Sequence, residues 1–218
     1  GVADVAEVWG DVWAVGLAGA SRRQSSMWSS VEVPGATRIV FSVSPGLAQG
    51  EIWLGTNAGA IHLGSEGTST YDGTDGLPHS VVHQALEDRA GVVWFLCRAG
   101  LARLVNGRVE NLYEGVNFRS GVIGPDGMPW FGTSIGLLRW TGSDFVHELD
   151  GVTLYPRLVS SDGSVWAGSA SEGVLKYDGV AWTRPLPELD GHEVFDVAEG
   201  PSGEIWIASA VGLRLVHR

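Results

Sequence analysis

Short runs of alternating apolar and polar residues recur along this chain. The run Glu193–Ala198 is an example, and its period of two is typical of a half-buried β-strand. No segment keeps apolar residues three and four apart over ten residues, so the pattern does not favour helices. The hydrophobic pattern therefore predicts an all-β protein built from short strands.

One strand type returns six times. A tight turn such as Pro201–Gly203 is followed by a strand with a tryptophan near its start. We call these residues the anchor tryptophans: Trp13, Trp53, Trp94, Trp130, Trp166 and Trp206. They lie 40, 41, 36, 36 and 40 residues apart. A period near 40 residues with one aromatic residue per unit indicates a repeat array.

Two more strands complete each repeat. A third strand such as Gly173–Tyr177 is followed by a turn such as Asn106–Gly107, which is a strong hairpin signal. The fourth strand opens fifteen or sixteen residues after the anchor, at Trp28, Val109, Phe145 and Trp182. Four short antiparallel strands in about 40 residues form one propeller blade. The sequence predicts a six-bladed β-propeller as a single domain over residues 1–218, with the last blade lacking its outer strand. A seven-bladed parent from which this chain is cut is the alternative.

The amino-acid composition of the chain argues against some classes of function. The chain has 218 residues, 44% of them hydrophobic and 18% charged, which is enough apolar material for a buried core. Its net charge is −11 and it has no basic run, which argues against nucleic acid or an anionic membrane surface as a partner. No apolar run approaches the roughly 18 residues of a membrane helix. The lone Cys97 cannot form an intramolecular disulfide and is expected to be a small buried residue.

Part of the third repeat resembles a known family. The runs Tyr71–Pro78, Val81–Asp88, Gly91–Trp94 and Gly100–Leu104 resemble the two-component regulator propeller repeat. That repeat forms the extracytoplasmic ligand-sensing propellers of bacterial hybrid histidine kinases. Pro125–Trp130 is also similar to the Pro-Asp-Gly-x-x-Trp repeats of streptogramin-lyase-like propellers. The resemblance spans all six units and implies a sensory module in the periplasm or outside the cell, although the chain has no kinase or helical signalling segment.

Three motifs have a chemical interpretation and a structural one. Gly132–Gly136 matches the Gly-x-Ser-x-Gly motif that carries the nucleophilic serine of hydrolases, with Ser134 at the serine position. The equivalent residues of other repeats form a turn between two strands, so we expect a turn here as well. His79 and His83 lie four apart, yet in a loop and a strand, where this spacing does not bring two ligands together. Asp72 and Asp75 are expected to cap a turn and not to bind calcium. Neither a metal site nor a cofactor is predicted.

The predicted binding site lies where the innermost strands begin. Eleven residues before the anchors, these strands carry His83, Arg119, Tyr155 and Phe195, with Val40 as the predicted counterpart in the second repeat. The loops that enter the first strands and those that follow the tryptophan strands are expected to share one face, at the mouth of a central channel. The predicted ligand-binding residues are Arg38, Asn57, His79, His83, Arg98, Asn117, Arg119, Tyr155, Glu172 and His192. Converging arginines would suit a small anionic or polar ligand such as a carboxylate or sugar acid. The alternative is that these residues only pack between blades or pair locally with acidic residues.

The absence of a complete catalytic constellation favours a non-enzymatic propeller that binds a ligand or a protein. Two alternatives remain open. One is a lyase- or hydrolase-type enzyme that uses His83 or His192 beside a carboxylate. The other is a structural scaffold in a larger assembly. A bare last strand, residues 213–217, would invite strand addition from a partner.

Overall fold

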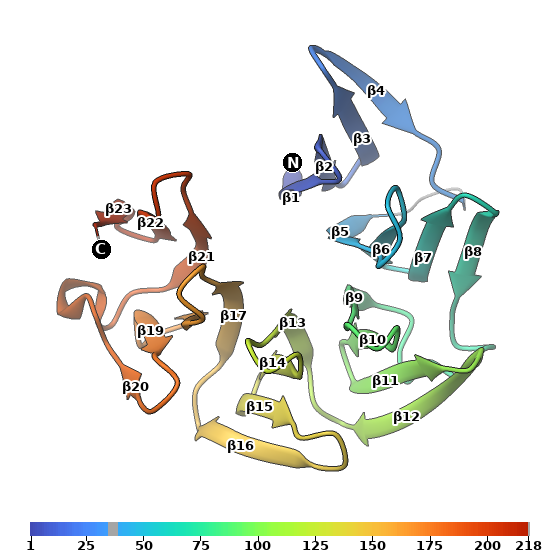
Figure 1. The fold of residues 1–218 in the computed structure, drawn as a ribbon. Helices are drawn as coiled ribbons and strands as arrows, with labels where there is room; N and C mark the ends of the chain where they lie inside the picture. The colour runs from blue at the N-terminus through green and yellow to red at the C-terminus, as the bar shows by residue number, and fades with distance from the viewer. Residues whose placement is uncertain (35–38, 218) are drawn as a thin grey trace. The chain divides into compact units, whose positions relative to one another are not determined.

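The predicted propeller fold is confirmed in the computed structural model, which describes residues 1–34 and 39–217. The described residues form 23 strands in six sheets, and each sheet keeps its strands in chain order (Figure 1). Five sheets have four strands and the last has three, as the sequence predicts. The helical structure among the described residues is one 3-10 turn, Pro187–Leu189, and no helix there is long and apolar enough to cross a membrane.

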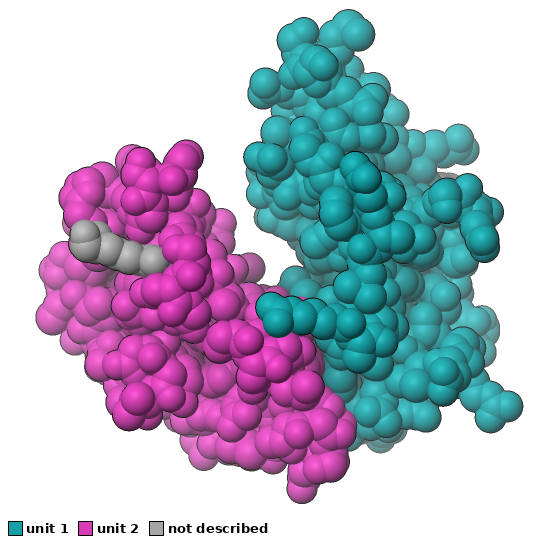
Figure 2. Space-filling model, viewed as in Figure 1, with its two compact units in different colours: residues 1–118 teal, residues 119–218 magenta. Residues whose placement is uncertain are grey.

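The described chain forms two compact units, residues 1–118 and residues 119–218 (Figure 2). The prediction of a single domain stays a prediction. The first unit contains three four-stranded blades. Blade 1 consists of β1 (Val2–Val8), β2 (Asp11–Gly16), β3 (Gly19–Gln24) and β4 (Met27–Val31). Blade 2 consists of β5 (Val40–Pro45), β6 (Ile52–Thr56), β7 (Gly59–Gly64) and β8 (Gly67–Tyr71). Blade 3 consists of β9 (Val82–Glu87), β10 (Val93–Cys97), β11 (Gly100–Val105) and β12 (Arg108–Glu114).

The second unit contains the remaining three blades except for Phe118, the first residue of β13. Blade 4 consists of β13 (Phe118–Ile123), β14 (Pro129–Thr133), β15 (Gly136–Trp140) and β16 (Phe145–Asp150). Blade 5 consists of β17 (Leu154–Val159), β18 (Val165–Ser169), β19 (Val174–Tyr177) and β20 (Trp182–Thr183). Blade 6 consists of β21 (Val194–Glu199), β22 (Ile205–Ser209) and β23 (Gly212–Val216).

The apolar core of each unit lies between consecutive blades, where the anchor tryptophans pack. Trp53 of blade 2 clusters with residues of blade 3 that include Val82 and Phe95. Trp166 of blade 5 clusters with residues of blade 6 that include Val194 and Ile207. The first five anchors are at most 5% exposed. The predicted role as packing residues between blades is confirmed for Trp13, Trp53, Trp130 and Trp166.

A buried indole N–H requires an acceptor, and the blades supply it in different ways. The donor–acceptor pairs are Trp53 Nε1 with Glu87 Oε2 at 3.0 Å, Trp94 Nε1 with Asp88 Oδ2 at 2.9 Å, and Trp166 Nε1 with Ser160 Oγ at 3.1 Å. Blade 4 has glycine, Gly124, at the position of Asp88 and Ser160. Within the described residues the Trp130 indole N–H is buried and finds no acceptor. A Cβ at position 124 would collide with this indole, because the ring occupies the space that a side chain would fill.

A basic residue on the third strand faces each of the first five anchors. The cross-strand pairs are Trp13 with Arg22, Trp53 with His62, Trp94 with Arg103, Trp130 with Arg139 and Trp166 with Lys176. The charged groups of Arg22, Arg139 and Lys176 lie 5.6, 5.4 and 5.2 Å from their ring centroids, a distance that permits cation–π attraction. Each of the five basic residues also has a carboxylate within 4.0 Å. These pairings recur from blade to blade and therefore belong to the repeat.

Candidate functional site

The two sets of loops named in the sequence analysis meet in blades 2, 3, 5 and 6. The backbone N–H of the residue that follows the second strand donates to the carbonyl of the residue that precedes the first strand. The bonds are Asn57 N to Ile39 O, Arg98 N to Val81 O, Ala170 N to Thr153 O and Ala210 N to Glu193 O, at 2.9 to 3.1 Å. This repeated bond places both loops at one end of the blade. Whether the ten predicted residues form one ligand site stays a prediction.

The predicted residues of the first unit have mainly local contacts. Asn57 Oδ1 accepts a hydrogen bond from Ile39 N at 2.9 Å, and His79 Nδ1 accepts one from Val81 N at 2.8 Å. The Arg98 side chain is exposed, and Asn117 Oδ1 is buried with no hydrogen bond from the described residues. Arg38 lies outside the described residues. Asn57 and His79 therefore shape the loop ends, because their side chains bind the backbone there.

His83 lies against Phe41, and this contact corrects one prediction. The two rings have centroids 5.7 Å apart. Trp53 pairs with Ser44, nine residues earlier, whereas Trp94 pairs with Leu86, eight residues earlier. The blade 2 turn is longer by one residue and not by two, so the counterpart of His83 is Phe41. The predicted counterpart, Val40, is wrong, since Val40 is fully buried in the core between blades 1 and 2.

In the second unit, two arginines lie close to one tyrosine ring. The guanidinium carbon of Arg119 lies 5.9 Å from the ring centroid of Tyr155, and that of Arg157 lies 5.5 Å from the same centroid. Both arginines are exposed and Tyr155 is 8% exposed. Neither guanidinium has a carboxylate within 4.0 Å among the residues that the structure describes. We call Arg119, Tyr155 and Arg157 the arginine–tyrosine cluster.

Sequence reasoning missed Arg157. The residue occupies a β-bulge, because the register of β17 and β18 shifts between Pro156 and Leu158. A bulge redirects a side chain from the face that simple alternation assigns to it. Pro156 beside it is the one sequence signal for a bulge, because a proline within a strand occurs mainly at edges and bulges. Spacing from the anchor tryptophan alone does not reveal the second arginine.

The other two predicted residues of the second unit, Glu172 and His192, have different contacts. Glu172 forms an ion pair with Arg184, which also lies 4.0 Å from Asp190. The backbone N–H of His192 donates to the backbone carbonyl of Leu189 at 3.0 Å. Glu172 therefore follows the alternative interpretation, in which a predicted site residue pairs with an oppositely charged side chain of its own blade.

The three motifs of the sequence analysis have structural roles. Thr133 Oγ1 donates to Gly136 O at 2.8 Å and accepts from Ile135 N, so Ser134 lies in a turn between β14 and β15. Asp72 Oδ1 accepts from Thr74 N at 2.7 Å, as a turn cap does. No cluster of three or more metal-ligating side chains is found among the described residues.

Cys97 is fully buried, as expected. Burial raises the pKa of its thiol from 9.0 to about 12, because the thiolate would lose its hydration. A neutral buried thiol is a poor nucleophile.

Comparisons with known proteins identify the fold. No protein-family model matches the sequence, and no curated protein matches it either. Among solved structures, the extracellular domain of a putative hybrid two-component system from B. thetaiotaomicron matches 98% of this chain with a TM-score of 0.81 and 16% identity. The extracellular domain of a putative one-component system from the same organism matches 100% of the chain with a TM-score of 0.80 and 16% identity. The likeness is one of fold.

This chain spans 33% of the length of each of those two structures. Virginiamycin B lyase from Staphylococcus aureus is also similar, with a TM-score of 0.74 and 15% identity over 100% of this chain and 84% of the lyase. The two families named from the sequence, sensor-system propellers and lyase-like propellers, are thus both represented among the structural neighbours.

Proposed function

We propose that this chain is a non-enzymatic ligand-binding propeller of a sensory protein, acting outside the cytoplasm. The observation that carries the proposal is the arginine–tyrosine cluster, whose two exposed guanidinium groups lie close to one ring with no carboxylate of the described residues within 4.0 Å. The chain's net charge of −11 makes such a locally positive place unusual for this protein. The fold likeness to extracellular domains of putative sensor systems supports the proposed location.

The chemistry of the cluster suits a small anionic ligand. Arginine presents a planar fork of N–H donors that matches the two oxygens of a carboxylate. Two guanidinium groups on one ring can engage one anion together, or engage an anion and a neighbouring hydroxyl group. The proposed ligand is therefore a carboxylate such as a sugar acid, and Tyr155 supplies a surface beside it.

The test is a ligand titration followed by thermal shift, with acetate and glucuronate as the probes. Loss of one charge-assisted contact costs about 1.5–3 kcal/mol, so Arg119→Ala and Arg157→Ala should each weaken binding by about 10- to 100-fold. Arg108→Ala is the matched control, because Arg108 is exposed and its removal changes the net charge equally. An unchanged response of both cluster variants, or no response of the parent protein, would overturn the proposal.

An enzymatic role has weaker geometric support. A general acid or base of the predicted kind needs an imidazole beside a carboxylate. His147 Nδ1 lies 2.8 Å from Asp150 Oδ1, and His62 Nε2 lies 3.7 Å from Glu51 Oε2. Neither is a histidine that the sequence analysis singled out, and His62 stacks on Trp53 with centroids 4.4 Å apart. A binding role agrees better with this arrangement.

We further propose that a polypeptide strand adds to β23. Leu213 is 58% exposed and Leu215 is 40% exposed, whereas Leu101 and Leu137, which follow the equivalent glycines in other blades, are fully buried. Trp206 is 38% exposed, unlike the other anchors. Light scattering over a concentration series, with amide exchange at residues 213–216, tests the proposal. Association between copies of the chain should protect these amides, and a protein that stays monomeric at every concentration while its β23 amides exchange freely would contradict the proposal.

A further inference from the structure

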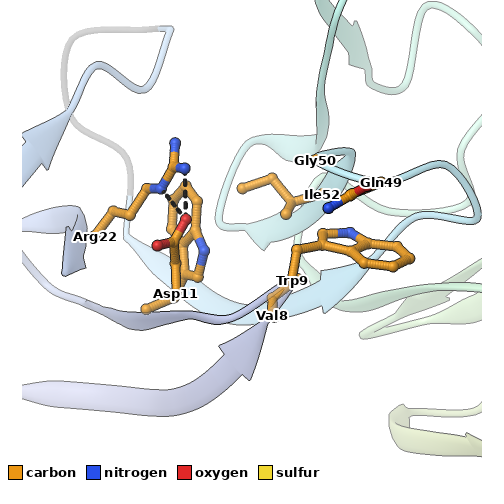
Figure 3. Close-up of a pocket in the computed structure, with 8 residues that line it drawn as sticks. Val8, Trp9, Asp11, Arg22, Gln49, Gly50 and Ile52 are labelled. Atoms are coloured by element: carbon orange, nitrogen blue, oxygen red, sulfur yellow. Dashed lines mark hydrogen bonds and ion pairs between the residues drawn. The ribbon is translucent and has the colours of Figure 1, made fainter. Parts of the chain in front are cut away.

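A small pocket lies between the turns of blades 1 and 2, within the first unit. Its volume is about 150 Å³, and none of its residues belongs to the predicted site (Figure 3). It is lined by Val8, Trp9, Asp11, Trp13, Arg22, Gln49, Gly50 and Ile52. Figure 3 shows the Trp9 indole and Gln49 on one side and the Asp11–Arg22 pair on the other. The pocket therefore combines an aromatic wall with polar groups at its edge.

Trp9 adopts a backbone conformation that its residue type disfavours. Its φ is 55°, and Gly10 follows with a φ of 83°, so the two residues form the turn between Val8 and Asp11. Positive φ at both central positions favours Asn-Gly, and the two-residue turn between β11 and β12 of blade 3 is indeed Asn106–Gly107. A bulky side chain in the left-handed region is strained. The turn alone does not explain a tryptophan here.

Burial does not explain Trp9 either, because the residue is 43% exposed. Its Nε1 donates to Glu51 O at 2.9 Å, which fixes the indole against the turn of blade 2. The ring is thus held in place while one side borders the pocket. A strained and exposed aromatic residue with a fixed orientation is a sign of a binding function.

We propose that this pocket binds a neutral aromatic ring that carries one hydrogen-bonding group. A cavity of 150 Å³ can hold a ring the size of benzene. The Arg22 Nη2 atom lies 2.5 Å from Asp11 Oδ2, so the two charges neutralise each other and the pocket favours neither an anion nor a cation. The Gln49 side-chain amide can both donate and accept a hydrogen bond, which suits a phenolic hydroxyl.

Such a ring has two possible sources, a free phenolic compound and a tyrosine side chain of a polypeptide. The probes are p-cresol and a tyrosine tripeptide with blocked termini, each titrated into the whole chain by saturation-transfer NMR. For p-cresol we expect a dissociation constant on the order of 1 mM, as is usual for a ligand of this size. Binding of the tripeptide at least tenfold tighter than p-cresol identifies a polypeptide partner, whereas equal or weaker binding identifies a free compound.

Trp9→Asn is the decisive variant. Asparagine suits the left-handed turn, so the variant should fold, and circular dichroism and the melting temperature verify this. Affinity for the bound probe should fall at least tenfold, because the aromatic wall is gone. Trp28→Asn is the matched control, since Trp28 lies in the same blade, is 52% exposed and does not line the pocket. Equal affinity of the parent and Trp9→Asn would overturn the proposal, as would failure of the parent to bind either probe.

A second variant keeps the proposal testable if Trp9→Asn does not fold. Gln49→Leu leaves the turn of blade 1 unchanged and removes the hydrogen-bonding amide. The parent should bind p-cresol at least threefold more tightly than toluene, and Gln49→Leu should bind the two compounds equally. If the preference for p-cresol is the same in both proteins, Gln49 does not contact the ligand and the proposed orientation is wrong.

Discussion

Asp88 should be among the most stabilising polar side chains of the first unit. It is 7% exposed and its carboxylate accepts three hydrogen bonds. Oδ2 accepts from the Trp94 indole at 2.9 Å, and Oδ1 accepts from Ala90 N at 2.9 Å and Val92 N at 3.1 Å. Asp88→Ala removes the acceptor of a buried donor and of two turn amides in a single change.

The expected loss follows from the exposure of each donor. Trp94 is 1% exposed, so water cannot replace the carboxylate, and leaving its N–H without this acceptor costs about 1–3 kcal/mol. The two turn amides lie near the surface and can bind water, so each loses only roughly 0.5 kcal/mol. The free energy of unfolding should fall by about 2–4 kcal/mol. For a chain of this size, each kcal/mol lowers the melting temperature by about 2–4 °C.

Urea unfolding followed by circular dichroism measures this loss. Asp126→Ala is the control, because Asp126 Oδ1 caps the equivalent turn of blade 4 by accepting from Met128 N, without a bond to the anchor tryptophan. It should cost less than about 1 kcal/mol. A double-mutant cycle with Trp94→Phe isolates the indole bond, and the coupling energy should be about 1–2 kcal/mol. Equal losses for the two aspartate variants, or no coupling to Trp94, would refute the reasoning.

Two further predictions concern a glycine and the buried thiol. Gly168→Ala should lower the unfolding free energy by about 1–3 kcal/mol, because a Cβ there would lie 2.5 Å from Val194 O. Gly73→Ala, in open space, should leave urea unfolding nearly unchanged. The thiol of Cys97 has its folded pKa raised from 9.0 to about 12, so the stability it contributes is complete below pH 9 and is lost as pH rises toward 12. Unfolding measured from pH 8 to 11 should show this loss in the parent and a smaller loss in Cys97→Ala.

The sequence by itself determined the architecture. Six tryptophans at near-constant spacing, with turn residues in register, predict six blades because a repeated core requires the same residue at the same strand position. The incomplete last blade, the role of the anchors and the turn around Ser134 could all be predicted from local patterns. The repeat also contains a signal that was missed, since a basic residue follows each of the first five anchors by nine or ten positions.

The tertiary structure decided the candidate sites, because they depend on small departures from the repeat. A bulge in β17 brings Arg157 beside Tyr155, and a turn longer by one residue places Phe41, not Val40, against His83. A sequence repeat gives the average position of a side chain, whereas a one-residue shift moves that side chain to another face of the strand. The Trp9 pocket depends in the same way on the hydrogen bond from its indole to Glu51, 42 residues later in the chain, and only the packing of blade 1 against blade 2 brings these residues together.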